Sequence, residues 1–303
     1  MKSIKKILCL FLGCVLFISC YDEGKIKPSE EPELIYGKYT LPQGDHDYDD
    51  DIVAFYKKYG SLLLYKFTTK DFGWSPTGNV AWDITTDTII IPGAGSKYDA
   101  QPADELYVSN QLELLQDKLF NYLSDTLMSC LPQKILLCST LDLVPIGLGY
   151  NPKPDERQPL NVYAGFYHIA VNWGSDKILT MTADERNQFK KDVCIAYFGS
   201  IVKSLGSPQE FFMVSNYSDN ISADDIYANG ILNHYHRTSL ENDWFDYLKL
   251  AIENSINDLE AEGGVLSESV DVNGKIREKY TIMIDFFESK YDFDIQAIGN
   301  DVE

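Results

Sequence analysis

The chain has 303 residues, with 46 Asp and Glu against 26 Lys and Arg, and its formal net charge at pH 7 is −20. Such an acidic chain repels nucleic acid and anionic membrane surfaces, so we expect no nucleic-acid partner. The length is sufficient for one large domain or two modest ones.

The first twenty residues have the pattern of a lipoprotein export signal. Three lysines precede an apolar run over residues 7–18, which is shorter than the roughly 20 residues that a membrane-spanning helix needs. Small Ser19 stands directly before Cys20, and this pair predicts cleavage after residue 19 and lipid attachment to Cys20. Cleavage would leave 284 residues with a formal charge of −23. The alternative is a plain secretory signal with an incidental Cys.

A tether is expected over residues 20–35, because the stretch is rich in Pro, Glu and Lys. Asp22 and Glu23, just behind the Cys, resemble the surface-export signal of Bacteroidetes lipoproteins. That resemblance implies attachment to the outer membrane with the protein facing outwards. Residues 36–303 are expected to form a single domain.

Periodicity and turn residues predict alternating helices and strands in this domain. A helix is expected between the acidic residues 49–51 and Gly60, since negative charge stabilises a helix N-terminus. A capping box at Thr182 and Glu185 predicts a long helix over 183–205. The other expected helices cover 104–123, 241–259 and 274–290, and the expected strands cover 62–67, 88–91, 134–140, 161–172 and 177–181. The predicted fold class is α+β, a mixed sheet with long helices packed on one side.

Three cysteines follow Cys20, namely Cys130, Cys138 and Cys194. They form no CxxC pair, and the last two lie within apolar patterns. Free thiols are therefore expected rather than a disulfide framework.

Several segments, in their order and spacing, resemble one family. The segments are "FYKKYGSLLLYKFTTKDFGW" at 55–74, "LPQKILLCSTLDL" at 131–143, the helix from Thr182, "SPQEFF" at 207–212 and "SLENDWFDYL" at 239–248. They resemble the substrate import-associated zinc metallohydrolase lipoproteins of Bacteroidetes, also described as zinc-binding metallopeptidases. The resemblance runs from about Tyr48 to Phe293. It implies a zincin-like fold, a zinc cofactor in the family, and a place near an outer-membrane nutrient-import complex of the SusC/SusD type.

In that family the long helix carries HExxH. Two His four residues apart lie on one helix face and bind one Zn²⁺, and the Glu activates the metal-bound water. Here Ala196 stands at the first His position, Tyr197 at the Glu position and Ser200 at the second His position. The third ligand position of the family falls on Asn242, while Asp246 matches a later acidic residue. We therefore expect no zinc cofactor and no catalytic residue in this chain, although Pro208 and Phe211 match a P-x-x-F element that follows the helix in the family.

Two other histidine clusters offer weaker alternatives. His234 and His236, with Glu241, Asp243 or Asp246, would be the metal site of a working hydrolase with a relocated centre. His46 lies among aspartates in 45–51, but the sixth and twelfth positions of a calcium loop would be Asp50 and Tyr56, so an acidic helix start is favoured. His168 alternates within a strand and is expected to be a hydrogen-bonded structural residue.

The sequence thus predicts an outer-membrane lipoprotein that acts as a non-catalytic accessory or binding protein. A peptide or glycan is expected between the helix over 183–205 and the strand over 161–172. Ala196 and Ser200 are expected to pack toward the strands, with Tyr197 beside the former metal position. The alternative is an active metal-dependent peptidase with its site at His234 and His236.

Overall fold

The structure is a computed structural model, and it describes residues 39–73, 81–83, 88–90, 96–147 and 153–302. Contacts divide the chain into two compact units, Met1–Tyr39 and Thr40–Glu303. All the helices and strands below belong to the second unit. The expected signal peptide, Cys20 and the tether lie outside the described residues.

The central strand of the sheet is β5 (Lys134–Pro145), which pairs with different neighbours along its two halves. Its first half is parallel to β1 (Leu62–Leu64) and to β8 (His168–Val171). Its second half is antiparallel to β4 (Ser96–Pro102) and to β6 (Gln158–Pro159). The remaining strands are β2 (Ala81–Asp83), β3 (Thr88–Ile90) and β7 (Val162–Ala164), and the main strand order is β2-β3-β4-β5-β8-β7.

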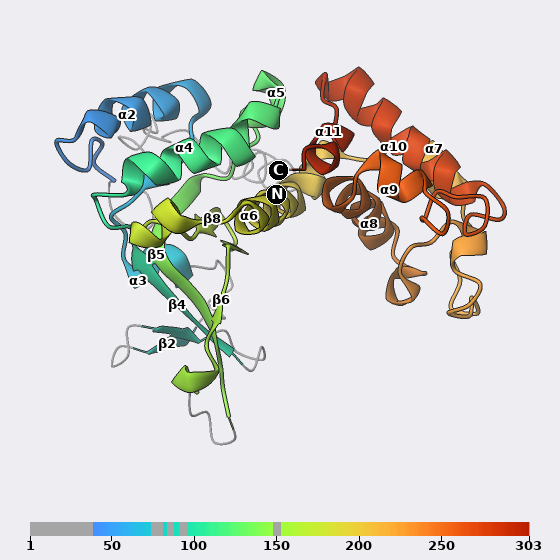
Figure 1. Cartoon of the computed structure of the whole chain (residues 1–303), viewed down its shortest axis with the longest axis horizontal. Coiled ribbons are helices and arrows are strands. Elements are labelled where there is room, and N and C mark those ends of the chain that lie inside the picture. Colours follow the sequence, from blue (N-terminus) through green and yellow to red (C-terminus); the bar gives the residue numbers. More distant parts are fainter. Residues whose placement is uncertain (1–38, 74–80, 84–87, 91–95, 148–152, 303) are drawn as a thin grey trace, which may run out of the picture. The chain divides into compact units, whose positions relative to one another are not determined.

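The parallel half of the sheet is buried on both faces, and its strands are apolar apart from Lys134 and His168. One face carries alternate residues of the three parallel strands, Leu63, Ile135, Leu137, Ile169 and Val171, which join a single core cluster with side chains of the helices. On the other face, Phe72 of α3 (Thr69–Gly73) covers His168, with 5.4 Å between ring centroids. The long helices therefore pack on one side of the sheet, which confirms the predicted fold class (Figure 1).

The longest helix, α6 (Ala183–Leu205), has the bounds that the sequence predicts. Thr182 accepts a hydrogen bond from the Glu185 N–H while Glu185 accepts one from the Thr182 N–H, and Gly206 ends the helix with a φ of 74°. Helix α6 contacts β7 and β8 on one side and α8 (Leu240–Glu253) on another (Figure 1). It thus joins the sheet to the C-terminal helices.

The other helices surround this centre in chain order. Helix α2 runs over Asp47–Tyr59 and ends at Gly60, which adopts a φ of 75°. The acidic residues 49–51 lie inside this helix, which therefore begins earlier than predicted. The remaining helices are α4 (Val108–Lys118), α5 (Asp125–Met128), α7 (Gln209–Met213), α9 (Ile256–Glu260), α10 (Lys275–Tyr291) and α11 (Gln296–Asn300).

Several predicted helices and strands are shorter or divided. The strand predicted over 62–67 ends at Leu64, because the N–H groups of Tyr65 and Lys66 donate to the Gln43 side chain instead of to a strand. The helix predicted over 104–123 is α4 followed by a 3₁₀ turn at Phe120–Tyr122, since Leu119 leaves helical geometry with a φ of −136°. The helix predicted over 241–259 is α8 and α9, because Ser255 caps a new helix.

The strands were harder to predict than the helices. The segment 161–172 forms two antiparallel strands, β7 and β8, and the N–H of Gly165 donates to the His168 carbonyl where the chain turns back. The segment 177–181 is wrong as a strand, because Asp176–Thr180 is a 3₁₀ helix that leads into the cap of α6. Strand β5 continues to Pro145, beyond the predicted end at 140, because β4 provides it with an antiparallel partner.

Two further findings concern the whole described chain. Cys130, Cys138 and Cys194 are free thiols, as predicted, and the last two are buried. No helix within the described ranges is long and apolar enough to cross a membrane.

Candidate functional site

Helix α6 places the positions of the HExxH pattern in different surroundings. Ala196 is half-buried and follows Asp192 by one helical turn, and Asp192 accepts a hydrogen bond from the Asn161 side chain at the start of β7, at 2.7 Å. Ala196 therefore lies on the face of α6 that meets β7. Ser200 is exposed, and its hydroxyl donates to the carbonyl of Tyr197 at 2.6 Å. The prediction that Ser200 packs toward the strands is wrong, because the buried stripe of α6 drifts away from this face along the helix.

Tyr197 points into the core. Its side chain is fully buried, and its hydroxyl donates to the Leu127 carbonyl at 2.5 Å. Burial raises the pKa of this phenol well above its usual range. The Leu127 carbonyl thus holds the Tyr197 hydroxyl inside the core, whereas Ser200 of the same helix is exposed. The prediction that Tyr197 lies beside a former metal position is therefore wrong.

Strand β7 forms the edge of the sheet next to α6. Gly165 donates to the His168 carbonyl and Asn172 donates to the Asn161 carbonyl, so residues 161, 163 and 165 direct their backbone groups toward β8. Antiparallel pairing alternates, and Val162 and Ala164 consequently direct their N–H and C=O groups away from β8. Ala164 is also exposed. This edge therefore offers backbone donors and acceptors beside α6.

Helix α8 lies against the same part of α6. A Cβ on Gly199 would come within 3.1 Å of the Phe245 ring, which shows how closely the two helices approach. Nearby, Lys203 forms an ion pair with Glu241 at 3.2 Å. Asn242, the predicted third-ligand position, is exposed in the first turn of α8, and its N–H donates to the Ser239 hydroxyl. The structure thus brings the segment around Ser200 close to the start of α8.

The residues of the alternative metal site predicted around His234 and His236 lie in three separate places. Glu241 pairs with Lys203, whereas Asp243 is fully buried and binds Lys279. His236 contacts Asp246, with 2.5 Å between Nδ1 and Oδ2. His234 and Asp246 line the same open depression, and Nδ1 of His234 is buried without a partner among the described residues. The described ranges contain no group of three His, Cys, Asp or Glu side chains that could hold a metal ion.

The sequence did not predict the buried pair of Lys279 and Asp243. The Lys279 ammonium also donates to the Gly230 carbonyl at 2.7 Å and lies 4.3 Å from the centre of the Phe211 ring. Burial lowers the pKa of Lys279 to about 8, against the opposing effect of Asp243. Burial raises the pKa of Asp243, although Lys279 acts in the opposite direction. Phe211, which belongs to the P-x-x-F element, is therefore an aromatic wall of this pair.

His168 and His46 occupy structural positions. Burial, and to a smaller degree the charge of Lys134, lowers the pKa of His168 to about 3. Its Nε2 has no hydrogen-bond partner within the described ranges, so the predicted side-chain hydrogen bond is not seen there. His46 caps α2, where its N–H donates to Asp49 at 2.9 Å and its Nε2 lies 3.2 Å from Glu105. This confirms that the acidic segment is a helix start.

The fold and the site define an α+β protein in which the edge strand of a mixed sheet lies beside a long capped helix. No protein-family model matches the sequence, and no curated protein matches it. Among solved structures, the chain is similar to a protein of Bacteroides caccae ATCC 43185 that is described as a candidate zinc-binding metallo-peptidase. The similarity covers 84% of this chain and 91% of that chain, with 10% sequence identity and a TM-score of 0.46. At this identity and score, the similarity assigns no activity.

Proposed function

We propose that this protein is a non-catalytic relative of the zinc metallohydrolases that its sequence resembles, and that it binds an extended peptide along the edge of β7 beside α6. Lipid on Cys20 would hold it on the outer membrane, facing outwards and near a nutrient-import complex. The lipid anchor and the import complex rest on the sequence pattern and the resemblance.

The geometry of α6 is the observation that supports the proposed loss of catalysis. A zinc site needs three or four well-placed N, O or S donors. Ala196 has no donor, Tyr197 is hydrogen-bonded inside the core, and the hydroxyl of Ser200 bonds to its own helix. The chain retains no water-activating carboxylate next to Ala196.

The edge of β7 supports the proposed ligand. An extended peptide that adds to a sheet edge gains affinity from main-chain hydrogen bonds, which do not require a metal. Val162 and Ala164 direct their backbone groups outward, and the half-buried Tyr163 lies between them. The hydrogen bonds from Asn161 to Asp192 and from the Trp173 indole N–H to Asn161 fix the start of this strand against α6.

The loss of zinc is tested by restoring its ligands. We expect purified wild-type protein to hold no stoichiometric zinc after dialysis, whereas Ala196→His, Ser200→His and Asn242→Glu together should bind it. Adding Tyr197→Glu removes the hydrogen bond to Leu127, so folding of this variant is checked by circular dichroism. Near-stoichiometric zinc in the wild type would overturn the proposal, and a folded triple variant without zinc would contradict the positional match.

Peptide binding is tested with Ala164→Pro, which removes one outward N–H and leaves the hydrogen bonds to β8 intact. The control, Ala164→Val, keeps that N–H. We expect an acetylated, amidated hexapeptide of alternating Thr and Val to bind wild type and Ala164→Val, and to bind Ala164→Pro at least about fivefold more weakly, as the loss of one hydrogen bond of about 1 kcal/mol implies. Equal affinity for all three proteins would contradict edge binding. Maltohexaose binding without hexapeptide binding would identify a glycan ligand instead.

A further inference from the structure

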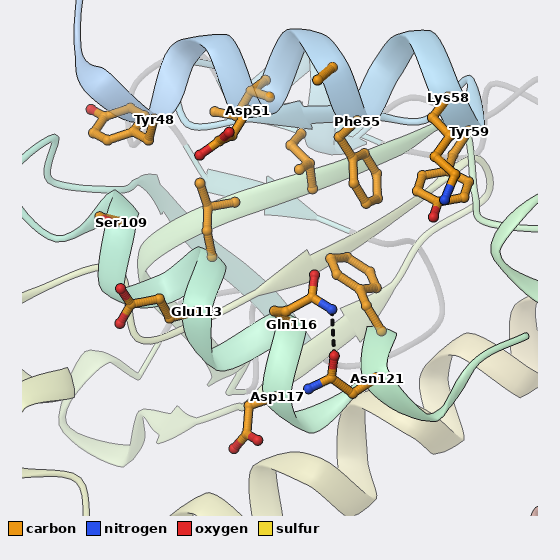
Figure 2. Close-up of a pocket in the computed structure, with 15 residues that line it drawn as sticks. Tyr48, Asp51, Phe55, Lys58, Tyr59, Ser109, Glu113, Gln116, Asp117 and Asn121 are labelled. Atoms are coloured by element: carbon orange, nitrogen blue, oxygen red, sulfur yellow. Dashed lines mark hydrogen bonds between the residues drawn. The ribbon is translucent and has the colours of Figure 1, made fainter. Parts of the chain in front are cut away.

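A groove lies between α2 and α4, and Figure 2 shows the residues that line it. These two helices are distant in sequence from β7. Its volume is about 590 Å³, within the range of roughly 300–1,000 Å³ that small-molecule sites occupy. Helix α2 supplies one wall, while α4 and the 3₁₀ turn after it supply the other. The groove plays no part in the proposed peptide binding.

The floor of the groove is apolar. Ile52 is fully buried there, and Phe55 and Phe120 approach each other with 5.0 Å between their ring centroids. Leu63 of β1 and Leu112 of α4 complete this floor. A ligand that fills the groove therefore needs an apolar body, because burying a polar group against these side chains would leave it without hydrogen bonds.

Two carboxylates at the groove have no cationic partner in the part of the chain that the structure describes. Asp51 of α2 and Glu113 of α4 line it from opposite walls, and neither forms an ion pair or a side-chain hydrogen bond with any described residue. In Figure 2, Asp51 reaches from α2 into the groove on the same side as Tyr48. The third acidic residue, Asp117, already pairs with Lys118 at 2.9 Å.

Lys58, the cation in the lining, already has an acidic partner outside the groove. Its ammonium pairs with Asp125 at 3.2 Å and lies 4.6 Å from the centre of the Tyr59 ring. Lys58 follows Asp51 by seven residues on α2, a distance of about 10 Å along the helix axis. The end of the groove at Asp51 is therefore negatively charged, and the end at Lys58 carries a lysine that is already paired.

We propose that the groove between α2 and α4 binds a small organic cation with an aromatic or branched apolar body. The apolar part would lie on Phe55, Leu112 and Phe120, above the fully buried Ile52. The ammonium group would lie between Asp51 and Glu113. The arrangement selects against anions of the same shape, because their charge would meet two unpaired carboxylates.

The test compares two probes of similar shape and opposite charge, tryptamine and indole-3-propionate, by isothermal titration calorimetry on the mature chain. We expect tryptamine to bind and indole-3-propionate not to bind, and we expect tryptamine binding to weaken as salt is raised. Asp51→Asn and Glu113→Gln should each weaken it by about three- to fivefold, the size of an exposed ion pair of up to about 1 kcal/mol. The control, Asp50→Asn, removes the same charge from the same helix outside the groove and should leave binding unchanged.

A second variant tests the apolar part of the proposal. Ala54 is exposed and lines the groove, so Ala54→Phe should fill it and abolish tryptamine binding without removing any charge. Equal binding of both probes, binding that Ala54→Phe leaves intact, or no tryptamine binding at millimolar concentration would each overturn the proposal. None of these outcomes affects the hexapeptide titration of the Ala164 variants. The proposal for the groove and the proposal for the edge of β7 can therefore be contradicted independently.

Discussion

Lys279 and Asp243 form an ion pair in which both side chains are fully buried. Removing one partner of such a pair leaves an uncompensated charge in the core, which costs about 3–5 kcal/mol. We therefore expect Lys279→Met to lower the free energy of unfolding by about this amount, measured by urea denaturation. The double variant Lys279→Met with Asp243→Asn should recover part of the loss, because it removes both charges.

The control is an exposed ion pair of the same chemical type. Lys203 and Glu241 join α6 to α8, and their side chains are 79% and 52% exposed. Exposed pairs contribute at most about 1 kcal/mol, so Lys203→Met should have a small effect. Equal effects of Lys203→Met and Lys279→Met would show that the buried pair is not important for stability.

His168 makes the stability of the fold depend on pH. Its pKa is about 3 in the folded chain, because burial disfavours the charged imidazole, whereas an unfolded His titrates near 6.5. Below pH 6.5 the unfolded chain takes up a proton that folded His168 does not, so stability falls as the pH falls from about 6.5 toward 3. At pH 5 the expected loss from this group is about 2 kcal/mol.

The variant His168→Phe removes this titration and keeps an aromatic ring beside Phe72 and Tyr163. We expect it to reduce the difference between the free energies of unfolding at pH 7 and pH 5, whatever its effect at pH 7. An unchanged difference would mean that other groups account for the acid sensitivity.

At the scale of the element, the N-terminal cap of α6 can be recognised from the sequence alone. Thr182 and Glu185 satisfy N–H groups that the first turn of the helix leaves without partners. We expect Thr182→Ala to cost about 1 kcal/mol of unfolding free energy, measured by thermal or urea denaturation. Thr180→Ala, two residues before the cap, is the control, and an equal loss there would argue against a specific capping effect.

Strand β7, by contrast, ends at a turn that the sequence pattern does not predict. The apolar pattern over 161–172 suggested one long strand, but Gly165 and the residues after it form a reversal that produces two short ones. Gly165 fits this turn because a Cβ there would lie 2.1 Å from the His168 ring. Gly165 and His168 are only three residues apart, but a run of apolar residues does not show that the chain turns back between them.

At the scale of the whole molecule, the proposed lipid on Cys20 would be the main contact with a membrane. The formal charge of −20 repels anionic surfaces, so Cys20 is the proposed membrane contact. We expect Cys20→Ala to abolish incorporation of a fatty-acid probe and to leave the protein unprocessed or released. Equal labelling of wild type and variant would contradict the lipoprotein proposal.

Local sequence determined the features whose causes lie within a few residues. The capped helix over Ala183–Leu205, the helix that ends at Gly60 and the mixed α+β class follow from capping side chains, a glycine with positive φ and hydrophobic periodicity. The same holds for the free thiols, because their spacing lacks a CxxC pair.

Only the tertiary structure decided what the side chains do. Tyr197 shares a helix with Ala196 and Ser200, but the packing of α6 against the core decides that Tyr197 bonds to Leu127 while Ser200 faces solvent. Asp243 and Lys279 are 36 residues apart, and their pairing depends on how α8 and α10 dock. A helical period shows which residues share a face, but the position of that face in the fold depends on long-range packing, which no local pattern contains.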